Sequence, residues 1–466
     1  MKETHDSFTK PTGDPFIDVG GYVIQCLGDR FPQKTIFELV EYATTIYIKQ
    51  WNSKLHTYFL NSSITQPAFN AEKKVSETLK YYKGLLEETN PDVKYGFCRI
   101  LGEETKLYVA GRSNHMMSAS GAFINFHSAY ESGLYLSKEA LIRIFFVPLG
   151  VCFVGDKVAL LQSNHAQVSS FLIQKNVEEN LKNVASGLSE GTLKSEYGIV
   201  TNALFSYADF CIGNLRIAII DEEDPLALKD VQLNMYHFTN FGASPDIVLY
   251  TFSNILFAFY AYCKKNYSTE WNGFINQHFK YSKFKDAHFD VSKQEWYNAK
   301  ERLGFDSYKI WNNPILNKLL KNESIIGHLC KWSRKNQFSF NIVEIYCINL
   351  LKMDKYTIQK IKELSDFILI NRSDDQITKA IVKLNGLKSS ADFRLFLIKL
   401  IKENYETKNP EPLITLEDYV LYLFPDGSFW KNTRDLLLIS IYQKLHELNL
   451  RLNDLPDIED IEENEE

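Results

Sequence analysis

The change in residue pattern near residue 246 places the strongest limit on what this chain can fold into. Before that point, strand-like runs at 95–101 and 106–110 lie among segments with helical spacing of apolar residues. After it, helical spacing continues through almost every segment up to residue 448. We therefore predict an α+β fold, in which a mixed N-terminal region with small antiparallel strands and helices precedes an all-α C-terminal helical bundle.

The same pattern predicts four regions. We expect an α+β N-terminal domain over 1–245, a basic, aromatic helical segment over 246–335, and a C-terminal helical bundle over 336–452. Residues 453–466 should form an acidic disordered tail, because the stretch from Asp454 carries eight acidic side chains and no basic one.

Capping residues and apolar spacing also place individual elements. Asp14 and Pro15 are the residues expected at the start of a helix. The predicted elements before residue 246 are helices at 13–28, 35–50, 68–87, 137–147 and 166–185, a hairpin at 150–162 with its turn at Gly155, and strands at 213–220 and 231–238. Beyond it we expect helices at 246–265, 292–302, 313–333, 340–352, 355–370, 374–385, 390–405, 415–423 and 431–448.

Composition excludes several classes of protein. The chain has 466 residues, 45% of them hydrophobic and 24% charged, which is the composition of a globular protein and not of a disordered one. No apolar run is long enough to cross a membrane, and the first residues lack the apolar core of a signal peptide, so we expect a cytoplasmic protein. Its seven cysteines are scattered without a C-x-x-C pair, which indicates reduced thiols and no metal site.

Catalytic motifs are missing from the sequence. There is no phosphate-binding loop, dinucleotide fingerprint, zinc-protease motif or nucleophile elbow, so we expect no enzyme and no cofactor. One alternative is a nuclease or hydrolase with a polar site near Asp14, Asp18 and Asn164, since paired carboxylates can hold a metal. The competing interpretation is structural. Asp14 caps a helix, Asp18 lies near the N-terminus of that helix, where the partial charge is positive, and Asn164-His165 form a turn.

A basic stretch in the middle of the chain is the best candidate for contact with nucleic acid. Residues 261–340 carry 14 Lys or Arg against seven Asp or Glu. Within 271–297, four lysines alternate with aromatic residues, and single-stranded nucleic acid binds such mixtures of cations and flat rings. The alternative is an ordinary amphipathic segment with buried rings and a solvated lysine face. The residues concerned are Lys280, Lys283, Lys285 and Lys293, with Trp271, Phe274, Phe279, Tyr281, Phe284, Phe289 and Trp296.

Four stretches together resemble a known family. They are TGDPFIDVGGYVI at 12–24, the stretch from SASGAFINFHSAY to VALLQSNH at 118–165, YHFTNFGASPDIVLYTF at 236–252, and LEDYVLYLFPDGSFWKN to KLHEL at 416–448. In this order they resemble the large subunit of the subtype I-B CRISPR Cascade surveillance complex.

The chain departs from this family at its paired C-x-x-C motifs. Met117 and Ser120 stand where the first cysteine pair is expected, and Ser137 and Ala140 where the second is expected. Since these side chains supply no thiolate, zinc should not bind there.

The resemblance implies a noncatalytic role in an RNA-guided antiviral complex. Such a subunit binds target DNA beside the guide-paired site, recognises the short adjacent motif, stabilises the opened strands and recruits a helicase-nuclease. Arg112, Asn114 and His115 lie in a polar segment that could read the motif, although a plain surface turn fits it equally well. Lys280, Lys283 and Lys285 would contact phosphates.

The implied partners are CRISPR guide RNA, target DNA, the Cascade backbone subunits, the helicase-nuclease and a small helical subunit. In complexes of this kind the small subunit is often translated from within the large-subunit gene. Met353 precedes a predicted helix and could start such a product, although it could also be a chance residue near a helix start.

Overall fold

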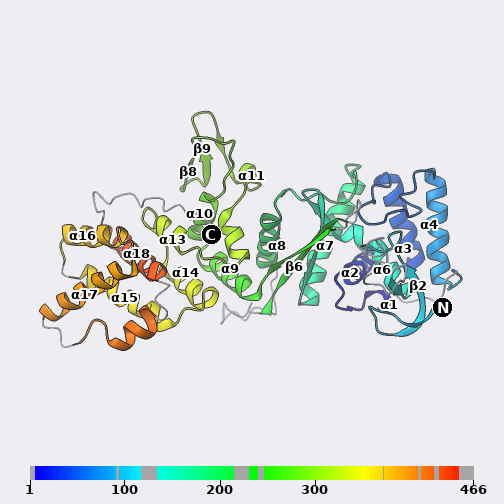
Figure 1. Cartoon of the computed structure of the whole chain (residues 1–466). Coiled ribbons are helices and arrows are strands. Elements are labelled where there is room, and N and C mark those ends of the chain that lie inside the picture. Colours follow the sequence, from blue (N-terminus) through cyan, green and yellow to red (C-terminus); the bar gives the residue numbers. More distant parts are fainter. Residues whose placement is uncertain are drawn as a thin grey trace. The chain divides into compact units, whose positions relative to one another are not determined.

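The computed structural model describes residues 6–90, 94–116, 134–214, 230–239, 246–370, 372–407, 411–424 and 430–450. The α+β class is confirmed, with small antiparallel sheets and a helical C-terminal region (Figure 1). The chain divides into two compact units; among the described residues, unit 1 ends at Phe257 and unit 2 begins at Ala258. Residues 215–220 of the strand predicted at 213–220, the motif at 117–120 and the tail at 453–466 lie outside the described residues.

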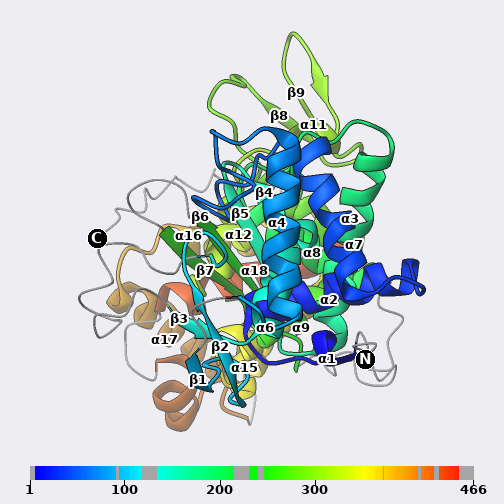
Figure 2. The ribbon, with the colours of Figure 1, turned by 90° about the vertical axis from the view of Figure 1, so that its right-hand side faces the viewer.

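The core of unit 1 forms where α2 (Pro15–Arg30) packs against α6 (Lys138–Gly150). A methyl group on Gly20 would stand 1.9 Å from the carbonyl oxygen of Arg143, so only glycine allows the two backbones this approach. Asp14 caps α2 as predicted, accepting hydrogen bonds from the amides of Phe16 and Ile17. The remaining helices around this core are α1 (Asp6–Thr9), α3 (Ile36–Thr45), η1 (Ile46–Gln50) and α4 (Ala71–Leu86), and α3 and α4 lie side by side in Figure 2.

Two antiparallel sheets complete unit 1. One has the strand order β4-β5-β6-β7, and its first turn is formed by Gly155, whose φ of +62° suits glycine. Its strands are Cys152–Val154, Lys157–Ser163, Leu233–Thr239 and Asp246–Phe252, and the helices between them are α7 (Ala166–Ala185) and α8 (Val200–Asn214). The other sheet joins β1 (Lys94–Phe97), β2 (Glu104–Ala110) and β3 (Leu134–Leu136).

Three sequence predictions were wrong. The helix expected at 246–265 begins with the strand β7, which pairs with β6 over seven residues before α9 (Asn254–Asn266) starts. Residues 292–302 form a hairpin instead of a helix, so the segment 246–335 is not wholly helical. Helix α8 was missed, and it occupies the start of the strand expected at 213–220.

Unit 2 contains a helical bundle and a small sheet. Helix α18 (Trp430–Glu447) packs against both α13 (Ile326–Ser333) and α15 (Lys355–Leu369). The other helices are α10 (Ser268–Gln277), α11 (Phe305–Tyr308), α12 (Pro314–Leu320), α14 (Phe340–Ile345), η3 (Tyr346–Leu350), α16 (Asp374–Asn385), α17 (Ser390–Glu406) and η4 (Asp418–Leu423). The sheet has the order β10-β9-β8 and consists of Arg302–Leu303, Glu295–Tyr297 and His288–Asp290.

Candidate nucleic-acid interface

The turn at 111–116, where a motif-reading loop was predicted, is held by the side chain of Asn114. Its carbonyl oxygen accepts the amide hydrogen of Gly111 at 2.8 Å. Its amide nitrogen donates to the hydroxyl of Tyr81 at 2.7 Å and to the carbonyl oxygen of Val109 at 2.9 Å. Both amide hydrogens and the carbonyl of this buried side chain are therefore in use within unit 1, which favours a structural role over base reading.

The sequence neighbours of Asn114 also have contacts within unit 1. The carbonyl oxygen of Arg112 accepts the amide hydrogen of Leu60 at 2.7 Å, which ties the turn to the loop after η1. Burial lowers the pKa of His115 to about 4, so its ring is neutral at physiological pH. The reading of an adjacent motif by Arg112, Asn114 or His115 stays a prediction.

The second pair of positions that replace the C-x-x-C motifs forms a helix cap. Ser137 precedes α6, and its hydroxyl accepts the amide hydrogen of Ala140 at 3.3 Å. Ser137 is fully buried beside Cys98, whose sulfur accepts the Ser137 amide hydrogen at 3.4 Å. This corner is thus fixed by capping and packing. Among the described residues, no cluster of His, Cys, Asp or Glu could hold a metal ion.

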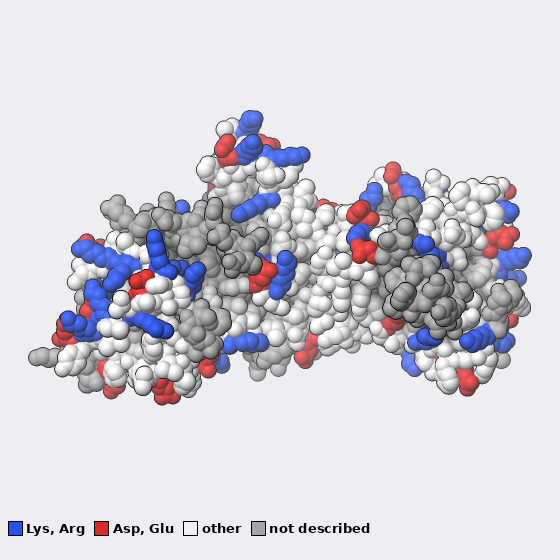
Figure 3. All heavy atoms as spheres, viewed as in Figure 1, with Lys and Arg blue, Asp and Glu red and all other residues white. Residues whose placement is uncertain are grey.

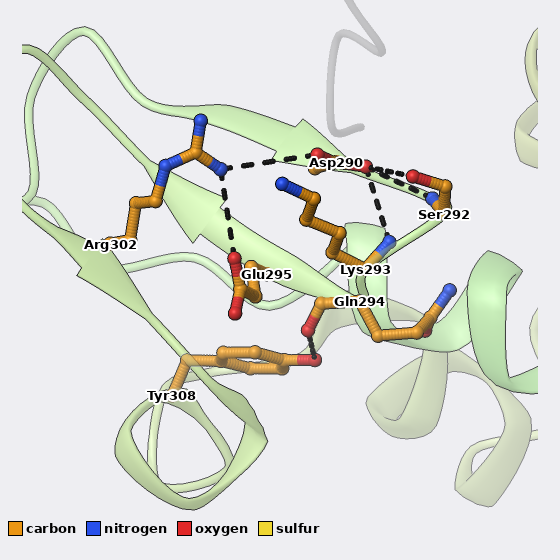
Figure 4. Close-up of polar contacts among 7 residues, drawn as sticks. All are labelled: Asp290, Ser292, Lys293, Gln294, Glu295, Arg302 and Tyr308. Carbon is orange, nitrogen blue, oxygen red and sulfur yellow. Dashed lines mark hydrogen bonds and ion pairs between the residues drawn. The ribbon is translucent and has the colours of Figure 1, made fainter.

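In unit 2, the strands β8, β9 and β10 form a three-stranded antiparallel sheet within the predicted basic segment. We call this sheet with its turns the hairpin. Asp290 closes its turn by accepting hydrogen bonds from the Ser292 hydroxyl at 2.7 Å and from the Lys293 amide at 3.2 Å, and these bonds lower the pKa of Asp290 (Figure 4). Arg302 on β10 reaches back to Asp290 at 3.9 Å and Glu295 at 3.6 Å. The turn residue Gln294, whose φ is 57°, accepts the Tyr308 hydroxyl at 2.9 Å through its backbone carbonyl.

The hairpin is anchored to the end of helix α10. The side-chain amide of Asn276 donates to the side-chain oxygen of Gln294 at 2.9 Å. The backbone carbonyl of Asn276 accepts the indole N–H of Trp296 at 3.1 Å. These bonds hold the strands to a rigid element, so the groups on their outer surface have a fixed support.

The lysines on and before this hairpin are exposed to solvent. Lys280, Lys283 and Lys285 precede β8, and none forms an ion pair with another described residue. Arg302 and Lys309, by contrast, are paired with nearby carboxylates. In Figure 3, basic side chains project from the part of unit 2 that carries the labels β8 and β9 in Figure 1, with acidic ones among them. The charges of these three lysines are available to phosphate groups.

Most of the aromatic rings in the segment are structural. Trp271, Phe274 and Phe279 are buried in unit 2, and Phe289 and Trp296 pack with ring centroids 5.3 Å apart. The buried rings therefore match the alternative interpretation of this segment, in which the rings are buried and the lysines solvated: Trp271 packs against Phe259 and Phe274 against Trp332, with ring centroids 5.3 and 6.0 Å apart. Tyr281 is 46% exposed and stacks at 5.7 Å on Trp311; Phe305, which sequence reasoning missed, is equally exposed.

The side chains considered for a nuclease or hydrolase site form hydrogen bonds within unit 1. A cavity of about 230 Å³ does bring Asp18 and Asn164 together in unit 1. Asp18, however, accepts three hydrogen bonds from the Thr12 amide and hydroxyl and the Gly13 amide at 2.7–2.8 Å. Asn164 bonds the backbone of Asp230 and Gln232, so it joins the end of β5 to the start of β6.

In a comparison with protein families, a model described as the DevT C-terminal domain matches residues 331–466. No curated protein and no solved structure matches the chain significantly. The matched segment contains the helices from α14 to α18, and thus most of the bundle of unit 2. Of the helices that the structure describes, none combines the length and the apolar character that crossing a bilayer requires.

Proposed function

We propose that this protein is a noncatalytic large subunit of a type I-B CRISPR Cascade complex. The observation that carries the proposal is the match of residues 331–466 to the DevT C-terminal domain, which is associated with that subunit. The resemblance of four ordered stretches to the same family, three of which lie outside the matched segment, supports it independently.

The chain would bind target DNA beside the guide-paired site, recognise the adjacent motif, stabilise the opened strands and recruit a helicase-nuclease. The exposed side chains of Lys280, Lys283 and Lys285, which precede the hairpin, support the DNA-binding part of this role. Because ammonium groups contact phosphates regardless of sequence, they would hold a strand without reading it. Base pairing with the guide RNA would supply the sequence specificity.

We also propose that the chain does not catalyse a reaction. The engagement of Asp14 as a helix cap and of Asp18 in three hydrogen bonds supports this view, because neither carboxylate is held open toward a substrate. Cleavage of the bound DNA would then be done by the recruited partner.

The proposed partners include the backbone subunits and a small helical subunit. A product that starts at Met353 would begin just before α15, whose N-cap is Asp354. It would contain α15, α16, α17 and α18 but lack α13, against which α18 packs in the full chain. Such a product would therefore expose an apolar face that a partner would have to cover.

A salt titration tests the DNA-binding role. The complex is assembled with its guide RNA, and target duplex binding is measured over a series of salt concentrations. Replacing Lys280, Lys283 and Lys285 with Ala should weaken binding equally for all sequences and reduce the slope of log affinity against log salt by up to about three.

The control variant replaces Lys49, Lys73 and Lys80, three exposed lysines of unit 1, with Ala. It removes the same charge and should change the slope less. An unchanged slope in the hairpin variant would refute the assignment of these lysines to phosphate contact.

A further inference from the structure

A cavity of about 210 Å³ opens beside the turn at 111–116. Three segments of unit 1 form its walls: the loop at 59–64, helix α4 and the turn itself, with Phe145 of α6 at its base. Its lining residues are aromatic residues, one isoleucine, and Ser, Thr and Asn, and no described residue among them is charged. Asn114, one of the residues predicted to read the adjacent motif, lines this cavity.

One hydroxyl in the cavity wall has no hydrogen-bond partner. Thr78 on α4 is 3% exposed, and its Oγ1 is bonded to no described group. The hydroxyl of Ser62, which also lines the cavity, does have a partner: Ser62 and Thr65 bond each other at 3.0 Å, and Thr65 Oγ1 also donates to the Phe59 carbonyl at 2.9 Å. Since a buried hydroxyl without a partner destabilises the fold, Thr78 is a candidate for bonding a ligand in the cavity.

The walls are rigid before any ligand arrives. The rings of Tyr82 and Phe145 lie 4.3 Å apart, and Phe59 stacks near Phe145 at an interplanar angle of 22°. The Asn114 side chain fixes the hydroxyl of Tyr81. A tyrosine hydroxyl is protonated at physiological pH and can donate a hydrogen bond, and burial, which raises the pKa of Tyr81 to about 12, extends this protonated range to higher pH.

We propose that this cavity binds a single unpaired nucleobase of a nucleic-acid strand. A base is planar and neutral, and it carries hydrogen-bond donors and acceptors along its edge. Enzymes that extrude bases hold them by stacking on aromatic groups and by bonding this edge. The volume lies below the range of about 300–1,000 Å³ found for drug-sized ligands and suits one ring system. The uncharged lining provides no counter-ion for a phosphate or a carboxylate.

The inference rests on the proposed function, because that function brings nucleic acid to unit 1. The base could come from target DNA or from guide RNA, and both present the same chemistry. Asn114 takes a supporting part in this arrangement, since it positions the Tyr81 hydroxyl and its own polar groups are already bonded.

The test uses the full chain and short single-stranded DNA or RNA oligonucleotides that carry one 2-aminopurine, whose fluorescence responds to stacking. Thr78→Val removes the hydroxyl at nearly constant volume, and Ser63→Phe fills the cavity. The control is Ser76→Ala, which removes a hydroxyl from the exposed face of the same helix.

We expect Thr78→Val to raise the midpoint of thermal unfolding while weakening oligonucleotide binding about fivefold, the loss typical of one hydrogen bond. Ser63→Phe should abolish the fluorescence change, and Ser76→Ala should alter neither quantity. A response in the DNA series alone would assign the base to the target, and a response in the RNA series alone would assign it to the guide.

Unchanged affinity and fluorescence in both cavity variants would overturn the inference. If the hairpin lysine variant weakened binding at the same time, the proposed function would stand without the cavity. If the protein bound no oligonucleotide but retained free adenosine or cytidine in equilibrium dialysis, and Ser63→Phe lost that binding, the cavity would stand and the proposed function would fall.

Discussion

In the turn at 111–116, internal hydrogen bonds occupy every polar group of the Asn114 side chain, whereas Lys280, Lys283 and Lys285 extend from the surface of unit 2 without ion pairs to described residues. The turn uses its polar groups to hold a shape. The hairpin is closed by the hydrogen bonds of Asp290, and the three lysines that precede it stay exposed. Polar side chains can thus be structural in one segment and available to a ligand in another, and the difference lies in which groups already have partners.

The largest expected effect concerns the buried side of this comparison. Asn114→Ala leaves the Gly111 amide, the Val109 carbonyl and the Tyr81 hydroxyl without their partner. We expect the free energy of unfolding to fall by about 3–4 kcal/mol in urea titrations, because each buried unpaired group costs about 1–3 kcal/mol. Lys283→Ala, the matched surface change, should stay within about 0.5 kcal/mol. Equal losses of stability in the two variants would contradict the proposal that the Asn114 side chain is structural and the Lys283 side chain is not.

The next effect depends on pH. His115 is neutral in the folded protein down to a pKa of about 4, whereas in the unfolded chain its pKa is near 6.5. The unfolded state therefore binds more protons between these values, and stability present above pH 6.5 is lost as pH falls toward 4. We expect this histidine to account for about 2–3 kcal/mol of that loss.

Urea titrations at pH 7 and pH 4.5 measure how far the free energy of unfolding falls between these pH values. In His115→Gln this fall should be smaller by the amount that His115 contributes. In unit 2, burial likewise lowers the pKa of His278 to about 4, so His278→Gln is the matched control. The part of the pH dependence that His278 contributes should persist in His115→Gln. A full pH dependence in His115→Gln would mean that the turn admits water and is not the closed structure described above.

The smallest effect concerns the exposed side. Tyr281 is the open ring next to the lysines, and Tyr281→Ala should weaken binding of single-stranded DNA by about 1–2 kcal/mol if a base stacks there. Tyr281→Phe should keep the wild-type affinity, since it keeps the flat ring. Fluorescence anisotropy with a labelled oligonucleotide measures both. A loss in Tyr281→Phe as large as in Tyr281→Ala would point to the hydroxyl and against stacking.

Local signals were read correctly where neighbouring residues decide the structure. The Asp14 cap, the Gly155 turn and the helix at 166–185 are of this kind. The strand at 246–252 was taken for a helix because a short apolar run has no decisive period, and its pairing with β6 settles the outcome.

Contacts between distant residues explain the remaining errors. Trp296 packs on Trp311 with ring centroids 6.2 Å apart, and this packing keeps 292–302 in a hairpin despite its helical composition. Asn114 bonds Tyr81, 33 residues away, which no local pattern reveals. The exposed lysines could be predicted because charged side chains without buried partners normally lie on the surface.

The position of α18 has a consequence for the order in which unit 2 can fold. This helix packs against α13, and the imidazole of His446 meets the carbonyl of Ser333, a residue 113 positions earlier in the chain. During synthesis, α13 emerges well before α18, the helix that covers it, so the apolar face of α13 stays exposed until α18 has been made. Because closing such a long loop precedes the gain from the contact, we expect the docking of α18 to be a late and slow step, during which unit 2 is most vulnerable to aggregation.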